Sequence, residues 1–259
     1  MPMLDRDGVA IYYEVHGSGP AVLLSHGFTL TCRMWDPQID ALSKDHQVIL
    51  WDMRGHGQSD SPEDQDLYTE ELTVADMAAI LRHLGVERAV VGGLSLGGYI
   101  SLAFPMHHPG MTRAIMAFDT GPGFKNPEAL RAWNERAERR ARDLETQGAD
   151  ALGSPEGEER DQAEARKSVH RSYEGLARAS RGMLAKKHSQ VIESLPDIRV
   201  PTLVMAGDGD ERYLRATDYM TAKIPGARKV ILEGAGHVAN AQVPEAFNAA
   251  VLEFLRDLP

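Results

Sequence analysis

Short apolar runs alternate with polar stretches along most of the chain. Runs of strand length that end at glycine or at a polar turn predict β-strands. They are Val9–Val15, Ala21–Leu24, Gln47–Trp51, Ala89–Gly92, Ala114–Phe118, Thr202–Ala206 and Lys229–Leu232. The turn "HGSGP" at 16–20 predicts a hairpin between the first two runs. Near-continuous apolar strands that alternate with helices are typical of a parallel sheet covered on both faces.

Two segments beside these strands carry clear helix signals. After the third strand, apolar residues recur at helical spacing from Met77 to Leu84, Gly85 follows them, and Thr73 is the expected N-cap. Apolar residues recur at the same spacing in Pro244–Leu258. We therefore expect both helices to pack on the sheet.

The interval from Asp119 to Leu195 is roughly 75 residues long, whereas a crossover between parallel strands needs about a dozen or more. Asn126 and Pro127 predict a helix start, and Ser154 before proline suggests a second. The charged run 131–143 is expected to be a solvated helix face with i,i+4 pairs. We interpret the interval as a helical cap. The predicted division is a core of residues 1–120 and 196–259 with a cap insert of 121–195 that is not an independent domain.

Composition and charge narrow the classes of partner. The chain has 259 residues, 42% of them hydrophobic, and a formal net charge of −10. An acidic chain lacks the basic surface that nucleic acids and anionic lipids require. No apolar run reaches membrane-spanning length, and the charged N-terminal residues are not typical of a signal peptide. Cys32 is the only cysteine, so an internal disulfide is not possible. We expect a cytoplasmic protein with a small-molecule substrate and no nucleic-acid or membrane partner. The sequence leaves open whether it forms a homo-oligomer.

A candidate nucleophile lies in "GLSLG" at 93–97, between a predicted strand and a predicted helix. This is the context that a G-x-S-x-G nucleophile elbow requires. The serine needs a strained backbone to expose its hydroxyl, and the residues two before and two after it must be small. The dinucleotide fingerprint G-x-G-x-x-G and the phosphate-binding P-loop pattern do not fit. The sequence therefore favours Ser95 as a nucleophile over an incidental serine in a glycine-rich turn.

A serine nucleophile needs a base and an acid that orients the base. His237 stands in "GAGHVAN", a glycine-bearing loop just after the last predicted strand, and is the expected base. Three carboxylates follow strand ends. Asp210 is favoured as the acid, because a carboxylate beyond the turn at Asp208 can reach back to the imidazole. Asp208 is better explained as a turn residue, and Asp119 is the weakest candidate.

Two backbone amides are expected to stabilise the oxyanion. One is that of Leu96, directly after the nucleophile. The other is that of Phe28 in "LLSHGFT", where His26 is expected to support the turn by hydrogen bonds. Further residues are assigned to a substrate pocket by position only, and each could equally belong to the core. They are Cys32, Trp35, Phe124, Trp133, Met183 and Val238. No base is placed for the Cys32 thiol, so it is not expected to be a nucleophile.

Five stretches in order, "SHGF", "WDMRGHGQSD", "GGLSLGG", "PTLVMAGDGDE" and "GAGHVANAQVPEAFN", resemble the α/β-hydrolase superfamily of serine hydrolases. Among its members the chain looks most like esterases, enol-lactonases and C–C hydrolases. The resemblance implies a mostly parallel eight-stranded sheet flanked by helices, with a helical cap inserted after strand six. It also implies a triad of Ser95, Asp210 and His237, no cofactor and no metal, and structural roles for Arg54 and His56. Haloalkane dehalogenases and epoxide hydrolases of this fold attack with aspartate, so a serine at the elbow disfavours them.

The residues and the resemblance together indicate a serine hydrolase. Its expected reaction is cleavage of an ester, lactone or thioester of a small, largely apolar substrate through an acyl-enzyme. The alternatives are a C–C hydrolase of the meta-cleavage type with the same triad, a cofactor-free perhydrolase side activity, and a ligand receptor on the same fold. The sequence does not choose the substrate.

Overall fold

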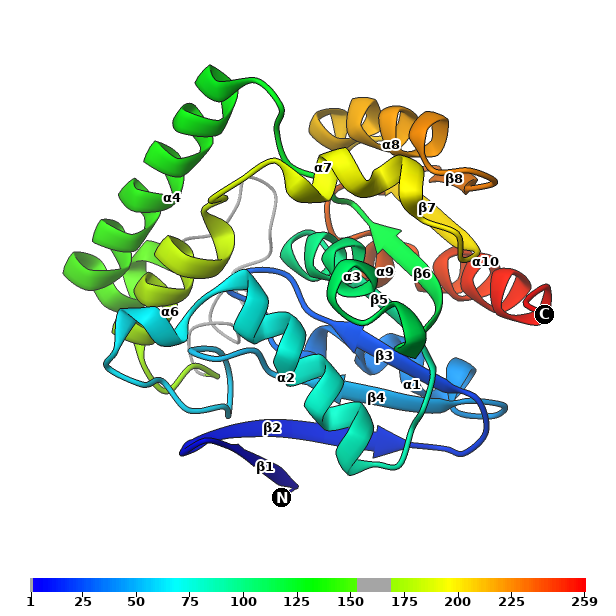
Figure 1. The fold of residues 1–259 in the computed structure, drawn as a ribbon, viewed down its shortest axis with the longest axis horizontal. Coiled ribbons are helices and arrows are strands. Elements are labelled where there is room, and N and C mark those ends of the chain that lie inside the picture. Colours follow the sequence, from blue (N-terminus) through cyan, green and yellow to red (C-terminus); the bar gives the residue numbers. More distant parts are fainter. Residues whose placement is uncertain (1, 153–168) are drawn as a thin grey trace.

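One sheet runs through the middle of the molecule in the computed structural model, which describes residues 2–152 and 169–259 (Figure 1). Its eight strands are β1 Met3–Arg6, β2 Val9–His16, β3 Ala21–Ser25, β4 Gln47–Trp51, β5 Ala89–Leu94, β6 Thr112–Phe118, β7 Thr202–Gly207 and β8 Arg228–Leu232. They lie in the order β1-β2-β4-β3-β5-β6-β7-β8. β2 is antiparallel to both of its neighbours, and the strands from β4 to β8 are parallel. The expected fold class is confirmed.

The hairpin predicted at 16–20 is wrong. β2 pairs with β1 and β4, and β4 separates it from β3. The hairpin lies instead between β1 and β2, where Asp7 and Gly8 both have positive φ, 58° and 85°. An Asp-Gly pair suits a two-residue turn of this kind. β1 was missed because it has only four residues, none of which is buried.

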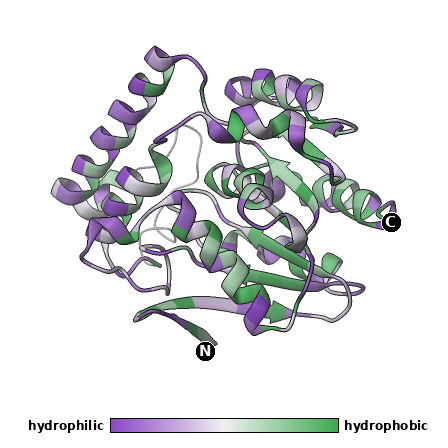
Figure 2. Ribbon diagram, viewed as in Figure 1, coloured by the Kyte–Doolittle hydropathy of each residue, from purple (hydrophilic) through white to green (hydrophobic). Residues whose placement is uncertain are grey.

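Helices cover both faces of the sheet (Figure 1). α2, α3 and α8 cover one face, and α1, α9 and α10 cover the other. Their bounds are α1 Asp36–Leu42, α2 Glu70–His83, α3 Leu96–His107, α8 Glu211–Lys223, α9 Ala239–Gln242 and α10 Pro244–Arg256. Short turns of 3-10 helix are η1 Cys32–Trp35, η2 Gln65–Leu67, η3 Pro109–Met111 and η6 Leu195–Asp197. Hydrophobic residues concentrate on the strands and on the helix faces toward them (Figure 2). Among the described residues, no helix has both the length and the apolar content of a membrane span.

Helix α2 begins four residues earlier than the sequence predicts. Thr69, not Thr73, is the N-cap, and its side-chain oxygen accepts a hydrogen bond of 3.1 Å from the Leu72 amide. Thr73 lies inside the helix, where its hydroxyl donates back to the Thr69 carbonyl. Two acidic residues, Glu70 and Glu71, fill the first turn and favour the start at Thr69 through the helix dipole.

The described part of the segment between β6 and β7 is helical, as expected. It contains α4 Pro127–Gln147, η4 Gly148–Leu152, α6 Tyr173–Ala179, the π-helical turn η5 Ser180–Leu184 and α7 Gln190–Ser194. α4 and α6 lie side by side at one end of the molecule (Figure 1). The Asn126 side chain caps α4 by accepting from the amides of Glu128 and Ala129. The second helix start, expected at Ser154, lies outside the described residues. The division of the chain into core and cap stays a prediction.

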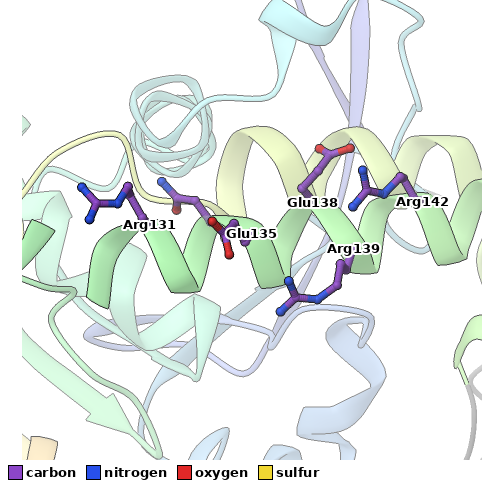
Figure 3. A pocket seen from close by; sticks show the side chains of 6 residues that line it. Arg131, Glu135, Glu138, Arg139 and Arg142 are labelled. Atoms are coloured by element: carbon purple, nitrogen blue, oxygen red, sulfur yellow. The ribbon is translucent and has the colours of Figure 1, made fainter. Parts of the chain in front are cut away.

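The solvated face of α4 carries an open recess of charged side chains (Figure 3). It is lined by Arg131, Asn134, Glu135, Glu138, Arg139 and Arg142. Among the described residues, the ion pairs of α4 do not follow the expected i,i+4 spacing. Glu138 and Glu145 of this helix both pair with Arg181, which lies just after α6. None of the expected catalytic residues lines this recess.

A buried amine connects the segment after η5 to the core. The Lys186 Nζ lies 3.3 Å from the centroid of the Tyr99 ring and donates to the Met183 carbonyl at 3.1 Å. The Tyr99 hydroxyl in turn donates to Glu70 at 2.6 Å. Burial lowers the pKa of Lys186 from 10.5 to about 7. The folded protein therefore favours the neutral amine.

Lys186 is expected to make stability rise with pH. Between pH 7 and 10.5 the unfolded chain binds a proton that the folded chain has lost, so the free energy of unfolding increases by about 1.4 kcal/mol per pH unit. Urea unfolding at pH 7, 8 and 9 should show this slope in the difference between wild type and Lys186→Met. The exposed neighbour provides the control, because Lys187→Met should keep the wild-type slope. Parallel curves for wild type and Lys186→Met would contradict the assignment.

Candidate active site

The expected nucleophile stands on a strained turn between β5 and α3. Ser95 has φ 55° and ψ −111°, a backbone conformation that residues other than glycine rarely adopt. Hydrogen bonds on both sides hold it there. The Ser95 amide donates to the Phe118 carbonyl at 2.9 Å, and the Thr120 hydroxyl donates to the Ser95 carbonyl at 2.6 Å. Strain that neighbouring strands maintain in this way is typical of functional sites.

The glycines two residues before and after Ser95 occupy positions without room for a side chain. A Cβ atom at Gly93 would lie 2.5 Å from the carbonyl carbon of Gly97. A Cβ atom at Gly97 would overlap the carbonyl oxygen of Ser25 and lie 2.6 Å from its carbonyl carbon. The requirement for small residues, expected from the sequence, thus comes from the close approach of α3 to the end of β3.

Gly97→Ala is expected to destabilise the protein by about 3 kcal/mol, the upper end for overpacking, because the obstructing atoms belong to backbone. Gly110→Ala is the matched control. A Cβ atom there meets nothing within 4 Å, so its free energy of unfolding should stay within about 0.5 kcal/mol of wild type. Urea unfolding measures both variants. Equal stability of the two would show that the crossing of β3 and α3 can widen.

The turn after β3 presents the second expected oxyanion donor. Neither the Phe28 amide nor the Leu96 amide donates a hydrogen bond to any residue of the described chain, so both are free to bind an oxyanion. His26 supports this turn as expected. Its Nδ1–H donates to the Gly27 carbonyl at 2.7 Å, and its Nε2 accepts from the Met53 amide at 2.9 Å. Burial lowers the pKa of His26, which keeps this imidazole neutral.

The expected base and acid meet at the ends of β8 and β7. The Nδ1–H of His237 donates to Asp210 Oδ2 at 2.6 Å. The His237 side chain is 42% exposed and that of Asp210 only 9% exposed, so the base is accessible while the acid is shielded. Asp210 occupies the N-cap position of α8 but makes no capping hydrogen bond. Its carboxylate is directed to the imidazole instead.

The other two carboxylates have structural contacts. Asp208 Oδ1 accepts from the Gly234 amide at 2.9 Å and so ties the two loops after β7 and β8 together. Asp119 is buried, and its Oδ1 accepts from the Gly207 amide at 2.9 Å. Burial raises the pKa of Asp119 to about 7. Of the three acids considered, Asp210 is the one that hydrogen-bonds His237.

All of these residues follow neighbouring strands. Phe28, Ser95, Asp119, Asp210 and His237 come after β3, β5, β6, β7 and β8, which are consecutive in the sheet and parallel. Their carboxyl ends share one edge, and β3 and β5 flank the point where the strand order reverses. In open α/β sheets this is where ligands bind.

Three of the residues assigned to a substrate pocket lie in the hydrophobic core, and the pocket assignment itself stays a prediction. Trp35 is fully buried and packs on Phe118 and Phe247, Cys32 lies in the same core cluster, and Met183 belongs to the core on the other face. Burial raises the pKa of the Cys32 thiol. Phe124 and Trp133 stack with centroids 5.6 Å apart, and Val238 follows the expected base.

One residue beside the base was not expected from the sequence. Tyr213, in the first turn of α8, stacks on the His237 ring with centroids 5.1 Å apart and an angle of 17° between the planes. The sequence signal for Tyr213 was its position three residues after Asp210 at the start of a helix, because residues at this spacing lie on one side of the helix. Among the described residues, no group of three His, Cys, Asp or Glu side chains is arranged to hold a metal ion.

Comparison with known proteins agrees with this architecture. The model of the alpha/beta hydrolase fold family matches residues 20–242. The 3-oxoadipate enol-lactonase 1 of Acinetobacter baylyi is 28% identical over 98% of this chain and 96% of its own length. The solved enol-lactonase of Burkholderia xenovorans LB400 is 28% identical, with a TM-score of 0.85, and the match covers 99% of this chain and 100% of that one. A thermophilic esterase of Thermogutta terrifontis is 29% identical, with a TM-score of 0.84 and coverage of 98% and 96%. Because the family model covers most of the chain, this protein belongs to the alpha/beta hydrolase fold family.

Proposed function

We propose that this protein is a serine hydrolase that cleaves an ester, lactone or thioester of a small, largely apolar substrate through an acyl-enzyme. The observation that carries the proposal is the hydrogen bond of 2.6 Å between His237 and Asp210, at the same sheet edge as a strained Ser95 and two free amides. The likeness to an enol-lactonase and an esterase, both 28% identical or more over nearly the whole chain, supports this class of reaction.

The proposed reaction has two halves. In the first, Ser95 Oγ attacks the carbonyl carbon while its proton passes to His237 Nε2, and the amides of Phe28 and Leu96 donate to the oxyanion. The C–O or C–S bond to the leaving group then breaks as His237 returns the proton to that group. In the second, His237 takes a proton from water, the resulting hydroxide attacks the acyl-enzyme, and Ser95 regains its proton as the acid leaves.

The Asp210 carboxylate sets the direction of these proton transfers. It accepts the Nδ1–H of His237, so the basic lone pair is on Nε2. Among the described residues, no hydrogen bond joins Ser95 to His237. Catalytic hydrogen bonds commonly tighten only when substrate is bound. We infer that the Ser95–His237 bond forms on substrate binding.

A second candidate is hydrolysis of a C–C bond in a substrate that carries a carboxylate. The observation that favours it is the Arg136 guanidinium, which lies 6.0 Å from the centroid of the Trp133 ring and pairs with no carboxylate of the described chain. Burial, together with the charge of neighbouring Arg212, lowers the pKa of Arg136. Such a cation could bind an anionic group of a substrate.

A substrate panel separates the two candidates from each other and from a receptor. The panel contains p-nitrophenyl acetate, an enol-lactone and a dienoate of the ring-cleavage type. Turnover of the ester and lactone with little turnover of the dienoate is the expected result. Faster turnover of the dienoate would favour the second candidate. Tight binding with no turnover of any compound would contradict hydrolysis and favour a ligand receptor.

A further inference from the structure

The imidazole of His237 has two partners that both come from the start of α8. Asp210, at the N-cap, accepts its Nδ1–H in the plane of the ring. Tyr213, three residues later, covers one face of the same ring with an angle of 17° between the planes. Residues three apart lie on one side of a helix, so a single turn of α8 supplies both contacts.

Tyr213 is held in place by contacts beyond the imidazole. Its backbone amide donates to the Asp210 carbonyl at 2.9 Å, which fixes the residue in the first helical turn. Burial raises the pKa of the Tyr213 phenol, so the ring stays neutral. A Cβ atom at Gly121 would lie 3.7 Å from the edge of the ring, so the segment after β6 packs against it. The neutral ring is therefore packed between the imidazole of the proposed base and the segment after β6.

The His237 imidazole needs a second contact, besides its hydrogen bond to Asp210, to fix its orientation. Its side chain is 42% exposed, and the bond to Asp210 is the one hydrogen bond it makes within the described chain. The second side-chain torsion of histidine has a broad energy minimum, so a single hydrogen bond at Nδ1 leaves the ring free to tilt. A flat ring packed on the imidazole face limits that tilt. Aromatic pairs contribute energy beyond their buried area when they stack in this way.

We propose that Tyr213 is a positioning residue, whose ring holds the His237 imidazole in the orientation that directs Nε2 toward Ser95. The inference rests on the proposed serine hydrolase function. The same contact has a second consequence. When the imidazole accepts the Ser95 proton, the π face of the tyrosine lies against the new positive charge and stabilises it.

The test compares variants that remove the ring with one that keeps it. Tyr213→Leu and Tyr213→Met both remove the ring but keep a large apolar side chain. The test needs only one of the two variants to fold. Each is expected to slow labelling by a fluorophosphonate probe, and to lower kcat for p-nitrophenyl acetate, by about tenfold, with KM changed less than about twofold. Tyr213→Phe should keep both rates within about threefold of wild type. Tyr219→Phe, on the same helix, is the matched control and should match wild type.

A proton NMR measurement gives a readout that needs no substrate. The imidazole proton shared with Asp210 should give a sharp far-downfield signal in wild type and Tyr213→Phe. In Tyr213→Leu or Tyr213→Met it should broaden through exchange with water, because the ring is less restrained. The inference would be overturned if Tyr213→Leu or Tyr213→Met were labelled at the wild-type rate and kept the sharp signal. It would also be overturned if Tyr213→Phe were labelled as slowly as these two variants. If wild type itself neither labels nor turns over esters, the proposed function fails, and the NMR comparison still decides the role of Tyr213.

Discussion

Ser95→Ala is expected to lower kcat for an ester or lactone substrate by about 10⁶-fold, leaving a rate close to the uncatalysed background. The size of the loss follows from the proposed covalent mechanism. Without the hydroxyl no acyl-enzyme forms, and the remaining donors can only assist direct attack by water. The strained backbone at residue 95 is maintained by contacts of its amide and carbonyl, so the fold should persist in the variant. Steady-state kinetics with p-nitrophenyl acetate measures the effect.

A buried serine on the helix that follows Ser95 provides the control for this variant. The Ser101 hydroxyl donates to the Gly97 carbonyl at 2.8 Å and does not reach the proposed site. Ser101→Ala should therefore keep kcat within a few-fold of wild type. Substantial turnover by Ser95→Ala, with Ser101→Ala unchanged, would show that hydrolysis does not pass through this serine.

Asp210→Asn is expected to lower kcat by about 10⁴-fold while the protein stays folded. An asparagine amide at this position donates to Nδ1, so the imidazole proton moves to Nε2. That nitrogen can then no longer accept the Ser95 proton. The measurement is kcat for the same ester, with circular dichroism as the check on folding.

The two other carboxylates that the sequence left open are the matched controls. Asp208→Asn and Asp119→Asn keep an oxygen that can accept from Gly234 and Gly207, and each should retain kcat within about tenfold of wild type. If Asp119→Asn lost as much activity as Asp210→Asn, the proposed triad would need two carboxylates. An active Asp210→Asn variant would exclude Asp210 as the acid.

Much of the fold followed from local pattern. The apolar runs predict seven of the strands to within about two residues, because a buried strand between helices must be apolar on both faces. Pairing was harder to predict. The turn at 16–20 looks like a hairpin, but β2 pairs with β4, a strand that begins more than 30 residues later. Local turn chemistry does not encode such a pairing.

The start of α2 shows a similar limit. Both Thr69 and Thr73 are residues that can cap a helix, and the sequence pattern favoured the one nearer the apolar stripe. The helix extends back to Thr69 because its first turn also buries Glu70, which hydrogen-bonds Tyr99 of α3. That contact joins two helices and is invisible in either segment alone.

The candidate site could be predicted further than its surroundings. Ser95, Asp210 and His237 follow three strand ends, and parallel strands bring their ends together whatever the loops contain. The same reasoning could not find Tyr213 or Lys186, since stacking and burial depend on how whole helices pack. For the same reason Trp35, assigned to a pocket by its position near the oxyanion turn, lies in the core against Phe118 and Phe247.

The most direct test of the proposed covalent mechanism is the mass of the protein after reaction with a fluorophosphonate, followed by peptide mapping. The account predicts a single adduct on the peptide that contains Ser95 in wild type, and no adduct in Ser95→Ala. An unmodified wild-type protein, or an adduct on any other residue, would contradict it.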